Sequence, residues 1–288
     1  MQERLLNIVR RFSERRLLIV GDSIADKFLY GSISRVSREA PVFILRHEST
    51  ETVPGGAANC ALNLAALGAN VSLVSVAGND EAGNALRDKL SAAGVNVEGL
   101  VLSEKIQTTT KVRILAGHAH ANKQQVIRVD YEDAPLNEPA LRETLTDSLK
   151  NSLPRADAVI LSDYNYGLVD QQAIELVREA HRSRNIPVLV DSRFRLSDFS
   201  GLTAATPNED EVEHLIGSPA ESLAQLETAA GRLRQQLQLD ALLVTRGRNG
   251  MMLVTEEPLA LHIPAVGAQA VDGTGAGDTV IATFALAL

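Results

Sequence analysis

The sequence has a single cysteine, Cys60, among its 288 residues. One thiol excludes an intramolecular disulfide and any zinc site built from several cysteines, and this scarcity fits a reducing, cytoplasmic location. Cys60 lies in an apolar, alanine-rich run. We therefore expect it to pack in the core.

Long apolar runs and clusters of positive charge are also missing. No segment supplies the ~20 consecutive apolar residues that a membrane helix needs. The net charge is −8 and the Lys and Arg residues are scattered, whereas nucleic-acid binding requires a basic face. The arginine-rich residues 1–16 include Glu3 and Glu14 and lack a small-residue cleavage site, so we expect a short packed helix there. Neither a membrane nor a nucleic acid is an expected partner.

The apolar residues that are present form strand-length runs that alternate with helical patterns. The runs are apolar throughout, which indicates strands buried on both faces and hence an α/β fold, with a mostly parallel central sheet flanked by helices. We expect one domain over residues 1–288, with the ligand at the carboxyl ends of the strands. The strand candidates are residues 17–20, 71–76, 158–161, 188–190 and 242–244, and the helical stretches are residues 83–93, 141–149, 171–184, 209–215 and 222–236.

Two segments, at about residues 28–53 and 105–130, interrupt this alternation and hold β-type residues. They could be loops, but ~25 residues without secondary structure are improbable inside a compact domain. We predict that they form a small β-lid.

A glycine-rich turn, Asp272-Gly273-Thr274-Gly275-Ala276-Gly277-Asp278, stands before what reads as a helix. Backbone N–H groups at a helix N-terminus favour anions, and glycines let a phosphate approach closely. Asp278 could accept a proton from an attacking hydroxyl. The alternative is a helix cap with small residues before it. A second glycine turn, Gly55-Gly56-Ala57-Ala58-Asn59, also opens an apolar helical run, residues 61–67.

Together the two glycine motifs resemble the signatures of the ribokinase-like sugar kinases, the phosphofructokinase B family. The resemblance implies sugar contacts from Gly55, Gly56 and Asn59, an anion hole at Gly275, Ala276 and Gly277, and Asp278 as the catalytic base. Over residues 17–284 the chain is similar to the D-glycero-D-manno-heptose 7-phosphate kinases of that family. The matching stretches are residues 20–22, 26, 30–31, 34–37, 39–42, 110–113, 127–130, 161–164, 206–208, 211, 243–246 and 250.

Asp22 ends the first predicted strand and Asp26 follows within the same turn, and each carboxylate could accept hydrogen bonds from sugar hydroxyls. A capped turn explains them as well. The resemblance also places Asp163 and Asp191 at the substrate.

Four basic residues could hold a phosphate already present on the sugar: Lys111, Arg113, Arg128 and Arg193. A solvated strand face is the alternative for each. Arg193 stands in Asp191-Ser192-Arg193, where the subgroup has Asp-Pro-Lys, and Tyr166 stands where it usually has lysine.

The nucleotide is expected between two further motifs. Asn208 and Glu211 are spaced i, i+3 at a helix start, and the resemblance implies that they organise Mg²⁺ through its waters. A helix cap is the alternative. Thr245, Arg246, Gly247 and Gly250 leave a strand in a turn that suits the outer phosphates of ATP, or forms a simple hairpin. The resemblance adds Thr274.

The resemblance implies ATP-dependent, magnesium-dependent phosphorylation of a sugar, most closely the anomeric hydroxyl of heptose 7-phosphate. The product would feed nucleotide-activated heptose synthesis, a route to lipopolysaccharide precursors. It also implies a homodimer formed through the lid. Another sugar or sugar-phosphate kinase is the alternative. The resembled kinases continue beyond the position of Leu288, so a short domain that binds sugar phosphate with impaired ATP binding is a further alternative.

Overall fold

The structure is a computed structural model that describes residues 2–117, 123–132, 136–266 and 275–288. A nine-stranded main sheet forms the body of the protein. Its strands are β1 (Arg16–Gly21), β4 (Asn70–Gly78), β5 (Asn96–Ser103), β8 (Ala158–Asp163), β9 (Val188–Ser192), β10 (Ala204–Ala205), β11 (Ala241–Thr245), β12 (Met251–Val254) and β13 (Leu261–Ile263). They are ordered β13-β12-β11-β10-β9-β8-β1-β4-β5. Neighbours from β11 to β5 pair in parallel, and β12 and β13 add an antiparallel edge.

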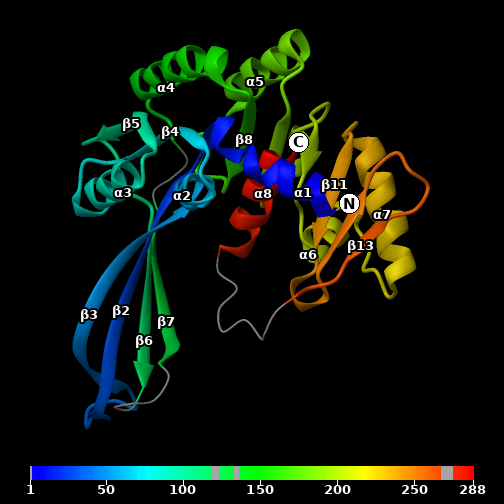
Figure 1. Cartoon of the computed structure of the whole chain (residues 1–288). Helices are drawn as coiled ribbons and strands as arrows, with labels where there is room; N and C mark the ends of the chain where they lie inside the picture. The colour runs from blue at the N-terminus through cyan, green and yellow to red at the C-terminus, as the bar shows by residue number, and fades with distance from the viewer. Residues whose placement is uncertain (1, 118–122, 133–135, 267–274) are drawn as a thin grey trace.

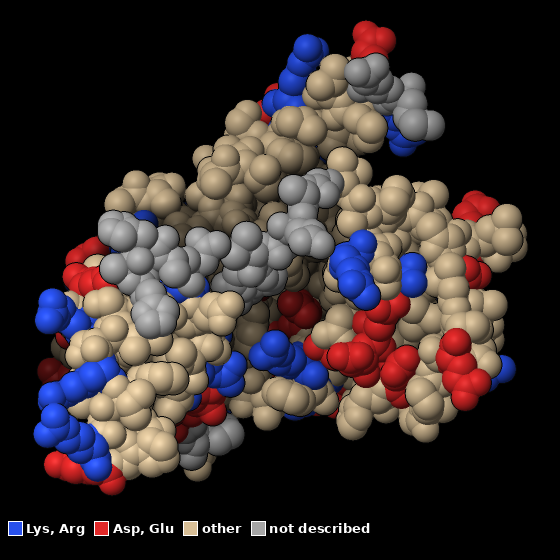
Figure 2. All heavy atoms as spheres, turned by 90° about the horizontal axis from the view of Figure 1, so that it is seen from below, with Lys and Arg blue, Asp and Glu red and all other residues tan. Residues whose placement is uncertain are grey.

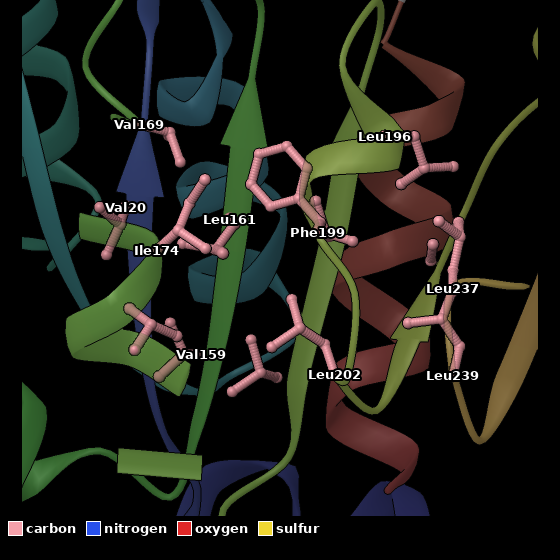
Figure 3. Packing of buried hydrophobic residues seen from close by; sticks show 14 of the residues in the cluster. Val20, Val159, Leu161, Val169, Ile174, Leu196, Phe199, Leu202, Leu237 and Leu239 are labelled. Atoms are coloured by element: carbon pink, nitrogen blue, oxygen red, sulfur yellow. The ribbon is translucent and has the colours of Figure 1, made fainter. Parts of the chain in front are cut away.

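Helices pack on both faces of this sheet (Figure 1). Along β1, Leu18 and Val20 join one apolar cluster, whereas Leu17 and Ile19 join the other, because successive side chains point to opposite faces. Figure 3 shows Val20 and its cluster around Phe199. The predicted α/β class is confirmed. One face carries α4 (Pro139–Ser152), α5 (Gln171–Arg184), α6 (Glu209–Ile216) and α7 (Leu223–Gln236), and the other carries α2 (Ala57–Ala66), α3 (Glu81–Ala92) and α8 (Ala276–Ala287).

The N-terminal helix α1 (Gln2–Arg10) packs less than the sequence suggests. Ile8 packs against the core, and Phe12 is buried in the short helix Phe12–Glu14 that follows. Leu5, Leu6 and Val9 are at least 50% exposed. Three further 3₁₀ turns occur at Leu153–Arg155, Leu196–Asp198 and Gly247–Asn249.

A separate four-stranded sheet forms the lid, which stands away from the body in Figure 1. It is built from β2 (Ser23–Val36), β3 (Phe43–Gly56), β6 (Thr110–Gly117) and β7 (Gln124–Tyr131), in the order β3-β2-β6-β7. β2 pairs antiparallel with β3 and parallel with β6. β2 begins two residues after β1 ends, so the lid is connected directly to the carboxyl end of a main-sheet strand.

Within the part of the chain that the structure describes, no helix combines the length and the apolar character that a membrane span requires.

Candidate active site

A cleft of about 1170 Å³ lies between the lid, the start of α8 and the carboxyl ends of β8, β9 and β11. Figure 2 shows the hollowed face, with acidic and basic side chains next to each other inside it. The cleft brings together most of the residues selected from the sequence: Asp26, Gly55, Gly56, Asn59, Lys111, Arg113, Arg128, Asp163, Asp191, Arg193, Asn208, Glu211, Thr245, Gly247, Gly250, Gly275, Ala276, Gly277 and Asp278.

Asp278 is buried in the first turn of α8. Its Oδ2 atom accepts a hydrogen bond from Asn59 Nδ2 at 2.7 Å, and its Oδ1 atom accepts one from the Tyr164 hydroxyl at 3.1 Å. Burial raises the pKa of Asp278 to about 6, against the opposing effect of these two hydrogen bonds. A carboxylate with a pKa just below neutrality is suited to general-base catalysis near pH 7.

Gly275, the N-cap residue of α8, has φ +78° and no side-chain capping hydrogen bond. A Cβ atom there would lie 2.6 Å from Asn59 Nδ2, so both conformation and space require glycine. The first backbone N–H groups of a helix lack partners within the helix and favour anions. The start of α8 can therefore receive a phosphoryl group next to the Asp278 carboxylate. Asp272, Gly273 and Thr274 lie outside the described residues.

The first glycine pair packs against the lid strand β2. A Cβ atom on Gly55 would lie 2.3 Å from Asp26 Oδ2, and Gly56 has φ +57° directly before α2. Asp26 faces the cleft, where its Oδ1 atom accepts hydrogen bonds from Arg113 Nε and Nη2 at 3.2 and 3.0 Å. Glycine at position 55 thus leaves room for a carboxylate on the lid side of the cleft.

Asp22, which the sequence placed at the sugar, does not line this cleft and borders a separate small cavity. It is buried, and its carboxylate accepts hydrogen bonds from the backbone N–H groups of Tyr164, Tyr166 and Leu168 at 2.8, 3.2 and 3.2 Å. Burial raises the pKa of Asp22 to about 6, against these bonds. The carboxylate shapes the loop after β8.

Two further predicted sugar ligands end neighbouring strands. Asp163 borders the cleft, but its carboxylate accepts hydrogen bonds from Arg195 and the Ser192 hydroxyl, both at 2.6 Å. Asp191 is half-buried beside the start of α8, with Oδ2 4.0 Å from the Cβ position of Gly277. Burial, and then the charge of Asp278, raises the pKa of Asp191 to about 7.

The predicted phosphate-binding residues line one side of the cleft. Lys111 on β6 is buried, and this burial lowers its pKa. Arg128 on β7 donates from Nε and Nη2 to the Asp130 carboxylate at 2.8 and 2.9 Å and is 46% exposed. Arg193 stacks over the Tyr164 ring, 5.8 Å from its centroid. With Arg113 they bring positive charge to the cleft from the lid and from the end of β9.

Asn208 and Glu211 form a reciprocal cap at the start of α6. Asn208 Oδ1 accepts from the Glu211 N–H at 2.8 Å, and Glu211 Oε2 accepts from the Asn208 N–H at 2.9 Å. Both border the cleft, and burial raises the pKa of Glu211. The described residues contain no group of three or more His, Cys, Asp or Glu side chains suited to a metal. One carboxylate and one amide fit Mg²⁺ only if it retains several waters, which Mg²⁺ commonly does.

The turn after β11 contributes backbone atoms to the cleft more than side chains. Gly247 and Gly250 have φ +52° and +86°, and a Cβ atom on Gly250 would lie 2.0 Å from the Ile263 carbonyl oxygen. Thr245 is at the end of β11 and borders the cleft. Arg246, in contrast, is not among the lining residues, and its Nε atom donates to Glu209 Oε1 at 2.8 Å. It orients α6 relative to the turn.

The family of the chain follows from comparison with known proteins. Residues 17–288 match the pfkB family of carbohydrate kinases. The chain belongs to this family. In this pfkB carbohydrate kinase one cleft is bordered by Gly55, Gly56, Gly275, Gly277 and Asp278.

Among curated relatives, this pfkB kinase is 42% identical over 280 residues to the bifunctional protein HldE of Pseudomonas syringae pv. tomato. It is 41% identical over 279 residues to HldE of Pseudomonas aeruginosa. Each match covers 96% of this chain and 56% of the relative. The chain therefore spans about half the length of the curated relatives it matches.

Solved structures share the fold at lower identity. Phosphofructokinase-2 from Escherichia coli, in complex with substrates and products, superposes with a TM-score of 0.74 and 19% identity, covering 94% of this chain and 85% of that one. Arabidopsis thaliana ribokinase, complexed with ribose and ATP, gives 0.72 and 21%, covering 95% and 85%. Both confirm the ribokinase-like architecture of this pfkB kinase.

Two residues of this pfkB kinase that bond to predicted site residues were not themselves selected from the sequence. Tyr164 contacts Asp278 and follows Asp163 at the end of β8, a position from which it could have been considered. Arg195 donates to Asp163 and to the Val169 carbonyl oxygen. The sequence carries no signal for that pairing, because it depends on how two loops meet.

Proposed function

We propose that this chain transfers the γ-phosphoryl group of ATP to the anomeric hydroxyl of D-glycero-D-manno-heptose 7-phosphate. The observation that carries the proposal is the Asp278 carboxylate, buried in the first turn of α8 beside Gly275 and Gly277 and facing a cleft with basic residues on its lid side. The resemblance to heptose 7-phosphate kinases and the identity with HldE support this choice of sugar.

In the proposed reaction the sugar oxygen forms a bond to the γ-phosphorus, and the bond from that phosphorus to the β,γ-bridging oxygen breaks, releasing ADP. The hydroxyl proton passes to Asp278 as the new bond forms. Backbone N–H groups at Gly275, Ala276 and Gly277 receive the phosphoryl oxygens, whose charge is spread over three atoms during transfer. These groups are held by the helix, so they need no reorganisation during the reaction.

The outer phosphates of the nucleotide would lie along the turn from Thr245 to Gly250. The N–H groups of Arg246, Asn249 and Gly250 already donate to carbonyl oxygens within this turn, so those of Gly247 and Arg248 would be the donors to phosphate. Asn208 and Glu211 would hold Mg²⁺ through its waters, and the ion would offset charge on those phosphates. Arg246 has no part in this proposal, because it is committed to Glu209.

The phosphate already on the sugar would bind among Lys111, Arg113, Arg128 and Arg193. Arginine suits this task because its guanidinium donates two parallel hydrogen bonds to phosphate. Arg113 also holds Asp26, so the same side chain would connect the phosphate to the carboxylate that binds sugar hydroxyls. The ring centroid of Tyr166 lies 5.9 Å from Lys111 Nζ. Tyr166 stands at the position where the resembled kinases usually carry lysine.

A coupled assay of ADP release across sugars and sugar phosphates tests the function directly. We expect heptose 7-phosphate to give the highest kcat/KM. Preference for fructose, ribose or another sugar phosphate would assign the chain to a different pfkB activity. Binding of the sugar phosphate without any ADP release would instead favour a binding protein with impaired ATP binding. A cytoplasmic location belongs to the proposal, since ATP is the donor.

The change Arg128→Ala should weaken binding of the sugar phosphate and leave binding of the unphosphorylated sugar nearly unchanged. Losing one charge-assisted hydrogen-bonded contact costs ~1.5–3 kcal/mol, which corresponds to a loss of about tenfold to a hundredfold in affinity. Calorimetry with heptose 7-phosphate and with free heptose measures both. Equal losses for the two ligands would mean that the Arg128–Asp130 pair supports the lid and does not bind phosphate.

We also propose a homodimer formed through the lid. Side chains on the cleft face of β6 and β7 include Lys111 and Arg128, so the alternate positions, such as Ile127 and Val129, point to the opposite face. Ile127 and Val129 are 53% and 39% exposed. An apolar sheet face left open in this way is typical of an interface.

The change Ile127→Glu should place a charge in that interface and convert dimers to monomers. Sedimentation velocity, with Arg38→Glu as a control at an exposed position outside the lid strands, measures the change. A wild-type chain that sediments as a monomer would contradict the lid dimer.

A further inference from the structure

We propose that Tyr164 is a positioning residue whose hydroxyl holds the Asp278 carboxylate in the orientation that receives the sugar proton. The inference rests on the kinase function proposed above and assigns a role to a residue outside the two glycine motifs.

The Asp278 carboxylate is held from two sides. Asn59 on α2 donates to Oδ2, and Tyr164 in the loop after β8 donates to Oδ1. Two donors on separate elements fix the plane of the carboxylate, which a single donor would leave free to rotate. A carboxylate oxygen can accept two hydrogen bonds, so each oxygen keeps an acceptor site for the substrate hydroxyl.

Tyr164 is itself held by two contacts. Its backbone N–H donates to Asp22 Oδ2 at 2.8 Å, and the guanidinium of Arg193 stacks on its ring. Asn165, the next residue, turns the chain with φ +66°. Asp22 therefore acts on the catalytic turn through Tyr164, by fixing the loop that carries this side chain, although it does not line the cleft.

Burial and the nearby carboxylates Asp278 and Asp191 raise the pKa of the Tyr164 hydroxyl, which keeps it protonated and a donor. A hydrogen bond to the charged form of a carboxylate lowers its pKa, so Tyr164 opposes the effect of burial on Asp278. The charged and titratable groups that interact with Asp278 include Asp26 on β2, Asp191 on β9, Arg193 after β9, and Cys60 on α2. Each remains when only the hydroxyl of Tyr164 is removed.

The test compares Tyr164→Phe with Tyr166→Phe in the full chain. The Tyr166 hydroxyl lies two residues along the same loop but donates to Glu132. Carboxyl-¹³C aspartate labelling, with Asp278→Asn to assign the signal, follows the titration of Asp278 without requiring turnover. Thermal unfolding confirms that both variants are folded.

In Tyr164→Phe we expect the titration midpoint of Asp278 to rise by about one pH unit, since one charge-assisted hydrogen bond is lost. The acid limb of kcat/KM should move by the same amount, and kcat should fall by roughly tenfold where Asp278 is ionised, because the base is less well oriented. The KM for the sugar should stay within about twofold, as no sugar contact is assigned to Tyr164. Tyr166→Phe should leave the midpoint where it is.

An Asp278 midpoint in Tyr164→Phe equal to that of the parent would overturn the inference, as would an equal shift in Tyr166→Phe. A parent chain that phosphorylates no sugar would contradict the proposed function instead. The two failures are separate because the carboxyl titration is read on the protein alone.

Discussion

The change Asp278→Asn is expected to lower kcat by about 10²- to 10⁴-fold, which is the usual contribution of a general base. The substitution is nearly isosteric, and the two neighbours of the carboxylate, Asn59 and Tyr164, can still form hydrogen bonds with an amide. Binding of the sugar phosphate should therefore persist. Single-turnover measurements with ATP and heptose 7-phosphate separate the loss of chemistry from any loss of binding.

Asp191→Asn is the matched control, because its carboxyl lies beside the same turn and also has a raised pKa. If Asp278 is the base, its substitution should cost far more in kcat than that of Asp191. A kcat for Asp278→Asn within about twofold of the parent, against the much larger loss typical of a missing base, would show that another group accepts the proton.

The change Asp278→Asn should also stabilise the fold above pH 6. Burial raises the pKa of Asp278 from 3.8 to about 6, so the folded chain binds a proton more tightly than the unfolded chain does. The cost of the buried charge is largest above the folded pKa and disappears as pH falls below the unfolded value. A shift of this size corresponds to at most about 3 kcal/mol. In urea unfolding at pH 8 and pH 4, Asp278→Asn should have a higher free energy of unfolding than the parent chain only at pH 8.

The main sheet could be predicted from the sequence because its central strands are buried on both faces. The runs 17–20, 158–161 and 188–190 all correspond to observed strands, β1, β8 and β9. The edge strands were not predicted. β5 is only partly buried and is interrupted near Gly99, where the register with β4 shifts, and β13 has three residues, largely exposed. An edge strand owes its conformation to one neighbour, which leaves little apolar pattern in its sequence.

The roles within the site were harder to predict than its location. Glycine motifs at 55–56 and 275–277 lead into α2 and α8, as their pattern indicates, and both border the cleft. The partners of Asp22 and Asp163 could not be read from the sequence. A carboxylate after a strand can bind a ligand or hold a loop, and the choice depends on which backbone N–H groups the fold brings to it. Here Asp22 holds the loop that positions Tyr164.

The change Gly275→Ala should be the other strongly disabling substitution, through geometry alone. Its φ of +78° costs a residue with a Cβ roughly 1–2 kcal/mol, and the new methyl would lie 2.6 Å from Asn59 Nδ2. Asn59 would have to move away from Asp278, and displacing a catalytic group by about 1 Å can cost 10²-fold in rate. We therefore expect turnover to fall by about that factor.

Gly217→Ala is the control for the cost of placing a Cβ atom on a residue with positive φ. Gly217 has φ +77° at the C-cap of α6, and nothing lies within 4 Å of its Cβ position. Both variants should lose similar thermal stability, and only Gly275→Ala should lose turnover. If the two variants kept the same kcat, the Asn59–Asp278 contact would not be what orients the base.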